Sequence, residues 1–280
     1  MSVETLEMSQ PNAALSPFVF AFIHRDETVC GQVVRVLPEL RCSIQIQTRD
    51  PYWLRDRDES ATWTRTPRFA VWAPRIAWSY GFVQRRVKAF AIGLTPAGFR
   101  AVTRTATAPL LGRVTALESF STLSAAAIDP GPAETFEDWV ARIHAPLRAF
   151  FAGAQPERRF DGALEILATG EGGVIARAAH ESGLSERQFR RVFTEHFGIA
   201  PKLYQRALRV DRMIRQLHPA PWEQDAHADA PLAFADQPHA IREFGEMTGV
   251  TPSDYALLKL GGDRTLRSFA IEGIAPPSGP

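Results

Sequence analysis

The chain has 280 residues, a formal net charge of +1 at pH 7, two cysteines and 45% apolar residues. This length fits one large or two ordinary domains and suffices to bury a core without disulfides or a metal. Two cysteines exclude a disulfide framework and a four-thiolate zinc site, so a reducing, cytoplasmic setting is expected. We expect neither a signal peptide nor a membrane partner, because no apolar run approaches the ~20 residues of a membrane helix. The near-neutral charge by itself argues against nucleic acid.

Residues 1–129 have the pattern of an antiparallel β domain. They are rich in Trp, Phe, Val, Thr and Pro, and turn-forming clusters separate short apolar or alternating runs. The expected strands lie within Gly31–Leu37, Cys42–Gln47, Arg68–Trp72 and Arg86–Ile92.

Residues 130–156 are expected to form a connecting helix and a linker. The breaker Asp129–Pro132 precedes Ala133–Gly153, in which apolar residues recur at helical spacing. Pro146 inside this run leaves open either a kink or a boundary between two short helices. The apolar face fits pairing between two chains as well as packing on the β domain. Gly153–Pro156 is the expected linker.

An internal repeat dominates residues 157–260. Ser185–Tyr204 and Asp236–Tyr255 share the pattern cap-x5-R-x-F-x4-G-x2-P-x2-Y at an offset of 51 residues. Each copy predicts a capped helix that ends at a left-handed glycine, followed by a helix that starts at proline. Two copies indicate two similar helical units rather than a solenoid, which needs at least three repeats.

The first copy has a complete set of helix signals. Ser185 and Gln188 form the pattern of a capping box, which predicts a helix over 185–197 that ends at Gly198. Another helix, Pro201–Leu217, follows. The face that we expect to be buried carries Phe189, Val192, Phe193 and Phe197.

The residues around this helix complete a helix-turn-helix pattern. Val174–His180 predicts a short alanine-rich helix, and a turn containing Gly183 separates it from the capped helix. In the second copy the corresponding helix is 236–248, and Ile241 and Phe244 are its expected apolar anchors.

Four segments, Gly183–Phe193, Gly198–Pro201, Phe234–Phe244 and Thr248–Pro252, resemble the C-terminal domain of AraC/XylS-type bacterial transcription regulators. The resemblance implies an α+β protein, with a β-rich, cupin-like sensor or dimerisation domain before an all-α double helix-turn-helix domain. It implies a sequence-specific regulator rather than an enzyme, acting on double-stranded DNA in the bacterial nucleoid. RNA polymerase is a further implied partner, and a homodimer and a small-molecule effector are left open.

The resemblance also places the residues that read bases. They fall on Arg187, Arg190 and Arg191 of the first unit and on Gln237, Pro238, His239 and Arg242 of the second. Arginine can pair bidentately with guanine in the major groove, and glutamine with adenine. One alternative is a solvated arginine-rich face of an ordinary helical domain. Another is a small-molecule-binding protein or enzyme with a vestigial helix-turn-helix module.

The two units differ strongly in charge. Residues 185–217 hold eight Lys/Arg against three Asp/Glu, whereas residues 220–258 hold one Arg against seven Asp/Glu. Because phosphate neutralisation supplies most of the affinity for DNA, we expect the first unit and the linker helix to dominate binding. Pro231 and Ala233, at a turn where the family normally carries glycine, also mark the second unit as weaker. The sequence does not sort phosphate contacts from solvated residues among Lys202, Arg206, Arg209, Arg212 and Arg215.

The β domain carries few candidates for chemistry. His24 is its single histidine, so the histidine set of a metal-binding cupin is missing, and no metal or other cofactor is expected. Cys30 and Cys42 fit buried structural thiols better than a redox pair or half of a zinc site. A core explains the aromatic set at least as well as a ligand pocket does; the set comprises Trp53, Trp63, Trp72, Trp78, Tyr80 and Phe82.

Two further features stay weak. Arg35–Glu39 and Gly93–Phe99 resemble a subgroup of these regulators, without indicating a ligand. Arg85, Arg86 and Lys88 fit a solvated strand better than an anion site. The tail, 261–280, is Gly/Pro-rich near its end and is expected to be irregular.

Overall fold

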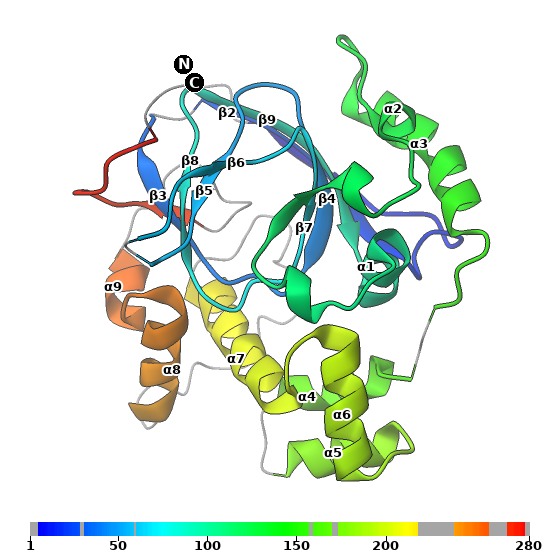
Figure 1. Ribbon diagram of the computed structural model, residues 1–280, viewed down its shortest axis with the longest axis vertical. Coiled ribbons are helices and arrows are strands. Elements are labelled where there is room, and N and C mark those ends of the chain that lie inside the picture. The colour runs from blue at the N-terminus through cyan, green and yellow to red at the C-terminus, as the bar shows by residue number, and fades with distance from the viewer. Residues whose placement is uncertain are drawn as a thin grey trace.

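The computed structural model describes residues 5–28, 31–58, 60–156, 159–169, 173–217, 238–257 and 268–277. Two antiparallel sheets occupy one side of the molecule in Figure 1, and the helices α4 to α9 occupy the other. The fold is thus a β-rich domain followed by a helical domain, as expected. Within the described residues no helix combines the length and hydropathy needed to cross a bilayer.

One sheet has the strand order β1-β2-β9-β4-β7-β10, and the other has the order β11-β3-β8-β5-β6. The first comprises β1 (Thr5–Ser9), β2 (Val19–Thr28), β9 (Arg86–Leu94), β4 (Cys42–Gln47), β7 (Phe69–Trp72) and β10 (Val114–Ala116). The second comprises β11 (Ser268–Ala270), β3 (Val33–Val36), β8 (Ser79–Phe82), β5 (Trp53–Arg55) and β6 (Thr64–Arg65). β4 has the predicted bounds, and β3, β7 and β9 overlap their predicted segments, because alternating burial is a local signal.

The expected irregular tail is wrong over Ser268–Ala270. These residues form β11, which pairs antiparallel with β3. A strand edge offers unpaired backbone donors and acceptors, which a short segment from elsewhere in the chain can satisfy. Three residues are too few to show a period in the sequence.

The helices of the β domain are α1 (Pro96–Thr103), α2 (Ala125–Ile128) and α3 (Phe136–Phe151). α3 runs through Pro146 without a break. Its apolar face lies in one core with β2, where Phe22 meets the ring of Trp139 edge-on. The connecting helix therefore packs on its own β domain, one of the two arrangements that the sequence leaves open.

The helical half has two cores that share α7 (Pro201–Leu217). The first lies among α7, α4 (Asp161–Thr169), α5 (Val174–Glu181) and α6 (Glu186–Phe197). The second lies among α7, α8 (Pro238–Thr248) and α9 (Pro252–Leu257). Leu37 of the β domain is fully buried in this second core, so the β domain and the helices share apolar packing.

Candidate nucleic-acid interface

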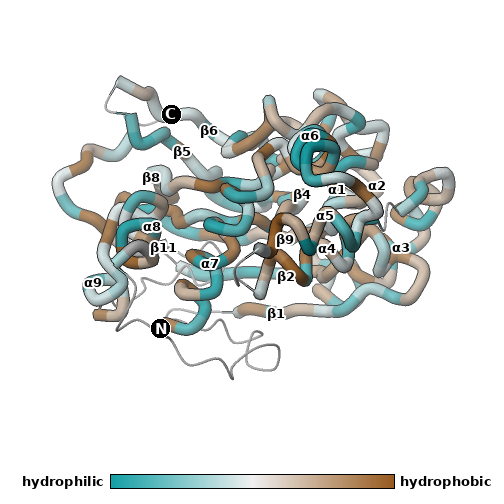
Figure 2. Tube along the Cα trace, turned by 90° about the horizontal axis from the view of Figure 1, so that it is seen from below, coloured by the Kyte–Doolittle hydropathy of each residue, from teal (hydrophilic) through white to brown (hydrophobic). Residues whose placement is uncertain are grey.

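α6 begins at the predicted capping box. The Ser185 hydroxyl accepts a hydrogen bond from the Gln188 amide at 3.4 Å, and the Gln188 side chain accepts one from the Ser185 amide at 3.1 Å. Phe189 and Phe193 are fully buried against α4 and α5. This packing orients the helix and leaves its opposite face in solvent. Figure 2 shows that much of α6 is hydrophilic.

All three predicted base-reading arginines of α6 are exposed. Arg190 pairs with Glu186 at 3.1 Å, and Arg191 pairs with Glu195 at 3.0 Å, each one helical turn away. Arg187 makes no hydrogen bond or ion pair with any residue in the described ranges. Exposed ion pairs contribute little, typically below about 1 kcal/mol, so neither pair prevents its arginine from binding another anion.

The second unit is described only from Pro238 onward. α8 begins there and ends at Thr248, the predicted last residue. Arg242 is exposed on it and makes no ion pair with a described residue. The predicted contacts of Gln237 and of the His239 side chain lie outside the described residues. So do the capping residue Asp236 and the turn with Pro231 and Ala233.

Ile241 is not an apolar anchor, contrary to expectation. Its side chain is 41% exposed, whereas Phe244 is fully buried. The buried stripe of α8 passes through Ala240, Phe244 and Met247. Ile241 follows Ala240 and lies about 100° further round a helix of 3.6 residues per turn, beside this stripe.

The structure sorts the basic residues of α7. Arg206 and Arg209 both donate to the Glu243 carboxylate of α8, with closest N–O distances of 2.9 and 2.7 Å. Arg206 also pairs with Glu246 at 2.6 Å. The two other engaged arginines are Arg212, which donates to the Ala168 carbonyl, and Arg215, which pairs with Asp211 at 2.8 Å. Lys202 is exposed and pairs with no described residue. Acidic residues of the second unit therefore neutralise Arg206 and Arg209 of the linker helix.

The C-terminal end of α6 contacts the β domain. The Thr107 hydroxyl donates to the carbonyl of His196 at 2.9 Å, and Arg100 contacts the His196 ring. Gly198 ends the helix with φ +78°, and a Cβ there would lie 2.7 Å from the backbone nitrogen of Ala108. A side chain at this position would be strained by the left-handed backbone conformation and would also clash with the backbone of Ala108.

The C-terminal end of α8 is held in the same way. The Trp78 amide donates to the carbonyl of Met247 at 2.9 Å, and the Arg35 guanidinium donates to the carbonyl of Gly249 at 2.6 Å. Arg35 also lies 4.3 Å over the Trp78 ring. Gly249 has φ +76° and is the repeat partner of Gly198. The β domain thus covers the C-terminal ends of both helices, and the exposed arginines lie nearer their other ends.

The candidate residues of the β domain take part in packing and ion pairs within the fold. Cys42 is buried, and desolvation, helped by Glu39, raises the pKa of its thiol, as expected for a structural cysteine. Cys30 lies outside the described residues. Arg86 pairs with Asp26 at 2.7 Å. Of the aromatic set, Trp72 lines a cavity between the sheets, whereas Trp78 contacts the end of α8.

Residues 178–257 match a family model described as a helix-turn-helix domain, in agreement with the AraC-type resemblance expected for this part of the chain. No curated protein sequence matches the chain.

Several solved structures of ToxT from Vibrio cholerae are similar over most of the chain. The P21 crystal form has 8% identity and a TM-score of 0.45, covering 84% of this chain and 97% of that one. ToxT from strain O395 has 11% identity and a TM-score of 0.42, with coverages of 84% and 96%. ToxT of strain SCE256 with a bound unsaturated fatty acid has 9% identity and a TM-score of 0.44, with coverages of 84% and 94%.

Proposed function

We propose that this protein is a sequence-specific transcription regulator that reads double-stranded DNA through α6 and, to a lesser extent, α8. The observation that carries the proposal is the face of α6 that exposes Arg187, Arg190 and Arg191 on a capped helix of an AraC-type domain. Recognition helices contact bases with their first turns, and guanidinium groups match the hydrogen-bond acceptors of guanine. The proposed activity is binding, not catalysis.

Ion pairs within the helical domain support unequal contributions of the two units to DNA binding. Phosphate contacts need cations that can leave their protein partners. Arg206 and Arg209 are held by Glu243, so Lys202 is the cation of α7 best placed for phosphate. We therefore assign most of the affinity to the first unit and a secondary, selective role to Arg242, with Gln237 and His239 as its proposed companions.

The remaining partners follow from the resemblance to AraC/XylS regulators. We propose cytoplasmic action at the bacterial nucleoid, contact with RNA polymerase and a homodimer. The apolar face of α3 is already covered by the β domain, so the dimer would need another surface. We also propose that a small molecule bound to the β domain controls the regulator, which the cavity between the two sheets supports.

The decisive test is selection of bound sequences from random double-stranded DNA by the full-length protein. Arg187→Ala and Arg190→Ala should each cost about 1–3 kcal/mol of binding free energy and relax the preference at one base position. Lys202→Ala should weaken binding to all sequences and reduce the salt slope by about 1. Arg148→Ala, which changes an exposed residue of α3, is the matched control. Absent or sequence-independent binding would refute the proposal.

A further inference from the structure

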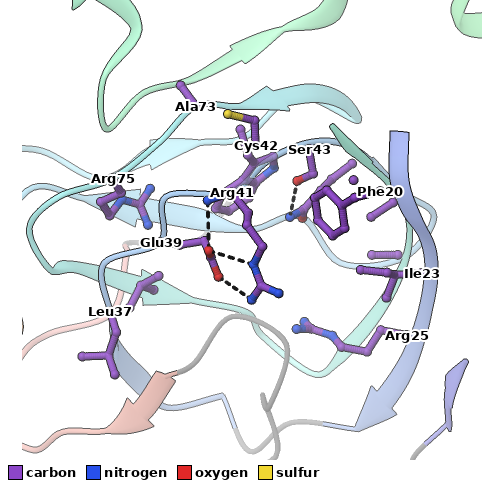
Figure 3. Close-up of a pocket in the computed structure, with 16 residues that line it drawn as sticks. Phe20, Ile23, Arg25, Leu37, Glu39, Arg41, Cys42, Ser43, Ala73 and Arg75 are labelled. Carbon is purple, nitrogen blue, oxygen red and sulfur yellow. Dashed lines mark hydrogen bonds and ion pairs between the residues drawn. The ribbon is translucent and has the colours of Figure 1, made fainter. Parts of the chain in front are cut away.

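A cavity of about 110 Å³ lies between the first sheet and β3 (Figure 3). Phe20, Ile23, Val36 and Leu37 supply apolar walls. Its charged lining residues are Arg25, Arg41, Arg75 and Glu39. Three guanidinium groups and one carboxylate therefore surround a largely apolar space.

Carboxylates engage the three guanidinium groups to different degrees. The Glu39 carboxylate accepts two hydrogen bonds from Arg41, at 3.0 and 2.9 Å, and is thereby engaged. Arg25 lies 3.3 Å from the carboxylate of Glu27, which is buried. Arg75 is only 8% exposed, and its side chain forms no hydrogen bond or ion pair with any residue that the structure describes.

Arg75 is held at a cost. Burial lowers the pKa of Arg75 to about 10, against the opposing effect of Asp56. Its guanidinium lies 5.8 Å from the centre of the Trp72 ring, and Figure 3 shows it directed toward the cavity. Asp56 attracts Arg75 from a distance, but no described carboxylate contacts the guanidinium directly, and an anion bound directly to it would relieve the remaining cost of burial.

The size of the cavity limits the anion. An engineered apolar cavity of about 150 Å³ accepts a molecule the size of benzene. A space of about 110 Å³ is of comparable size and accepts a short chain or a single ring.

We propose that this cavity binds a small carboxylate with a compact apolar body, whose charged end pairs with Arg75 and whose body packs on Ile23 and Leu37. This inference rests on the proposed function, because it names the chemical class of the effector of that regulator. The bidentate match between guanidinium and carboxylate gives the site its preference for an acid over a neutral molecule of the same shape.

The wall of the cavity also contacts α8. Leu37 lines the cavity and is fully buried among Phe244, Met247 and other side chains of α7 to α9. Arg35, two residues earlier, donates to the Gly249 carbonyl at the end of α8. A ligand that moves Leu37 therefore acts on the packing of α8.

Pentanoate, with pentanamide as its neutral counterpart, tests the charge preference. Binding to the full-length protein is measured without DNA, by saturation-transfer NMR and calorimetry at millimolar ligand. We expect pentanoate to bind at least tenfold more tightly than pentanamide, and Arg75→Met to abolish this difference. Arg148→Met is the matched control and should leave the preference intact.

Ala91→Leu fills the cavity while keeping every charge, and it should abolish binding of both ligands. This variant decides the question if Arg75→Met fails to fold. Equal affinity for acid and amide, pentanoate binding that survives Ala91→Leu, or no binding at millimolar concentration would overturn the inference. Arg187→Ala should lose DNA affinity and still bind pentanoate, so failure of ligand binding and failure of DNA recognition are told apart.

Discussion

The Glu243 carboxylate joins α8 to α7 within the helical domain. It is almost fully buried, and it accepts hydrogen bonds from Arg206 and Arg209 of α7. Those arginines keep part of their surface in solvent, so the pair is not sealed from water. The acidic character of the second unit thus has a structural use, because it holds α8 on a basic helix.

Replacing Glu243 should loosen this contact. Glu243→Gln keeps the volume but removes the charge, and we expect a loss of about 1–3 kcal/mol of stability because both arginines lose a charged partner. The measurement is the urea midpoint of the helical circular-dichroism signal. Glu246→Gln, at an exposed site that pairs with Arg206, should cost less than about 1 kcal/mol. Equal effects of the two changes would contradict this assignment.

At the scale of the element, α6 is shaped by both of its ends. The capping box satisfies amides at the start, and Gly198 with φ +78° closes the end against the β domain. Buried Phe189 and Phe193 set the rotation of the helix between these ends. Rotation decides which side chains face outward, so the position of Arg187 and its neighbours follows from the packing of the opposite face.

Loss of the cap should fray the N-terminal end of α6. Ser185→Ala removes the acceptor for the Gln188 amide and should destabilise the first turn by about 1 kcal/mol. Faster hydrogen exchange of the first amides of α6, with unchanged exchange in α3, is the expected result. Ser185→Asn is the matched control, because asparagine is an equally good cap. Wild-type exchange in the alanine variant would show that the cap contributes nothing.

At the scale of the whole molecule, the β domain contacts the C-terminal ends of both α6 and α8. Figure 1 shows α7 between α6 and α8, with the two sheets along one side of this group. Thr107 binds the end of α6, and Arg35 with Trp78 binds the end of α8. The relative placement of the two helices therefore depends on the β domain as well as on α7.

The two contacts can be released separately. Arg35→Ala removes the hydrogen bond to Gly249 and the contact with Trp78, and should increase hydrogen exchange several-fold in α8 while α6 stays protected. Thr107→Val should do the reverse, since it removes the hydroxyl that binds the carbonyl of His196. Peptide-level exchange mass spectrometry distinguishes the two patterns. Uniform or unchanged exchange in both variants would contradict separate docking.

The helix-turn-helix unit of α5 and α6 was predictable because its signals are local. A capping residue, a phenylalanine stripe and a terminal glycine act within a few turns, and repetition at an offset of 51 residues raises them above chance. The end of α8 at Thr248 followed from the same repeat. Ile241 was wrongly predicted to be buried. Helical spacing shows the direction of the apolar face, whereas the elements packed against the helix decide how wide the buried part of that face is.

The sequence alone determined the class of domain and the residues proposed to meet DNA, since both depend on short spacings along the chain. Only the tertiary structure decided which cations of α7 stay available, because the pairing of Arg206 and Arg209 with Glu243 spans more than thirty residues. It also decided the strand at Ser268–Ala270 and the burial of Arg75 at the cavity, away from direct contact with any described carboxylate. Contacts between distant segments depend on packing and charge in the folded chain, and no short-range pattern in the sequence predicts them.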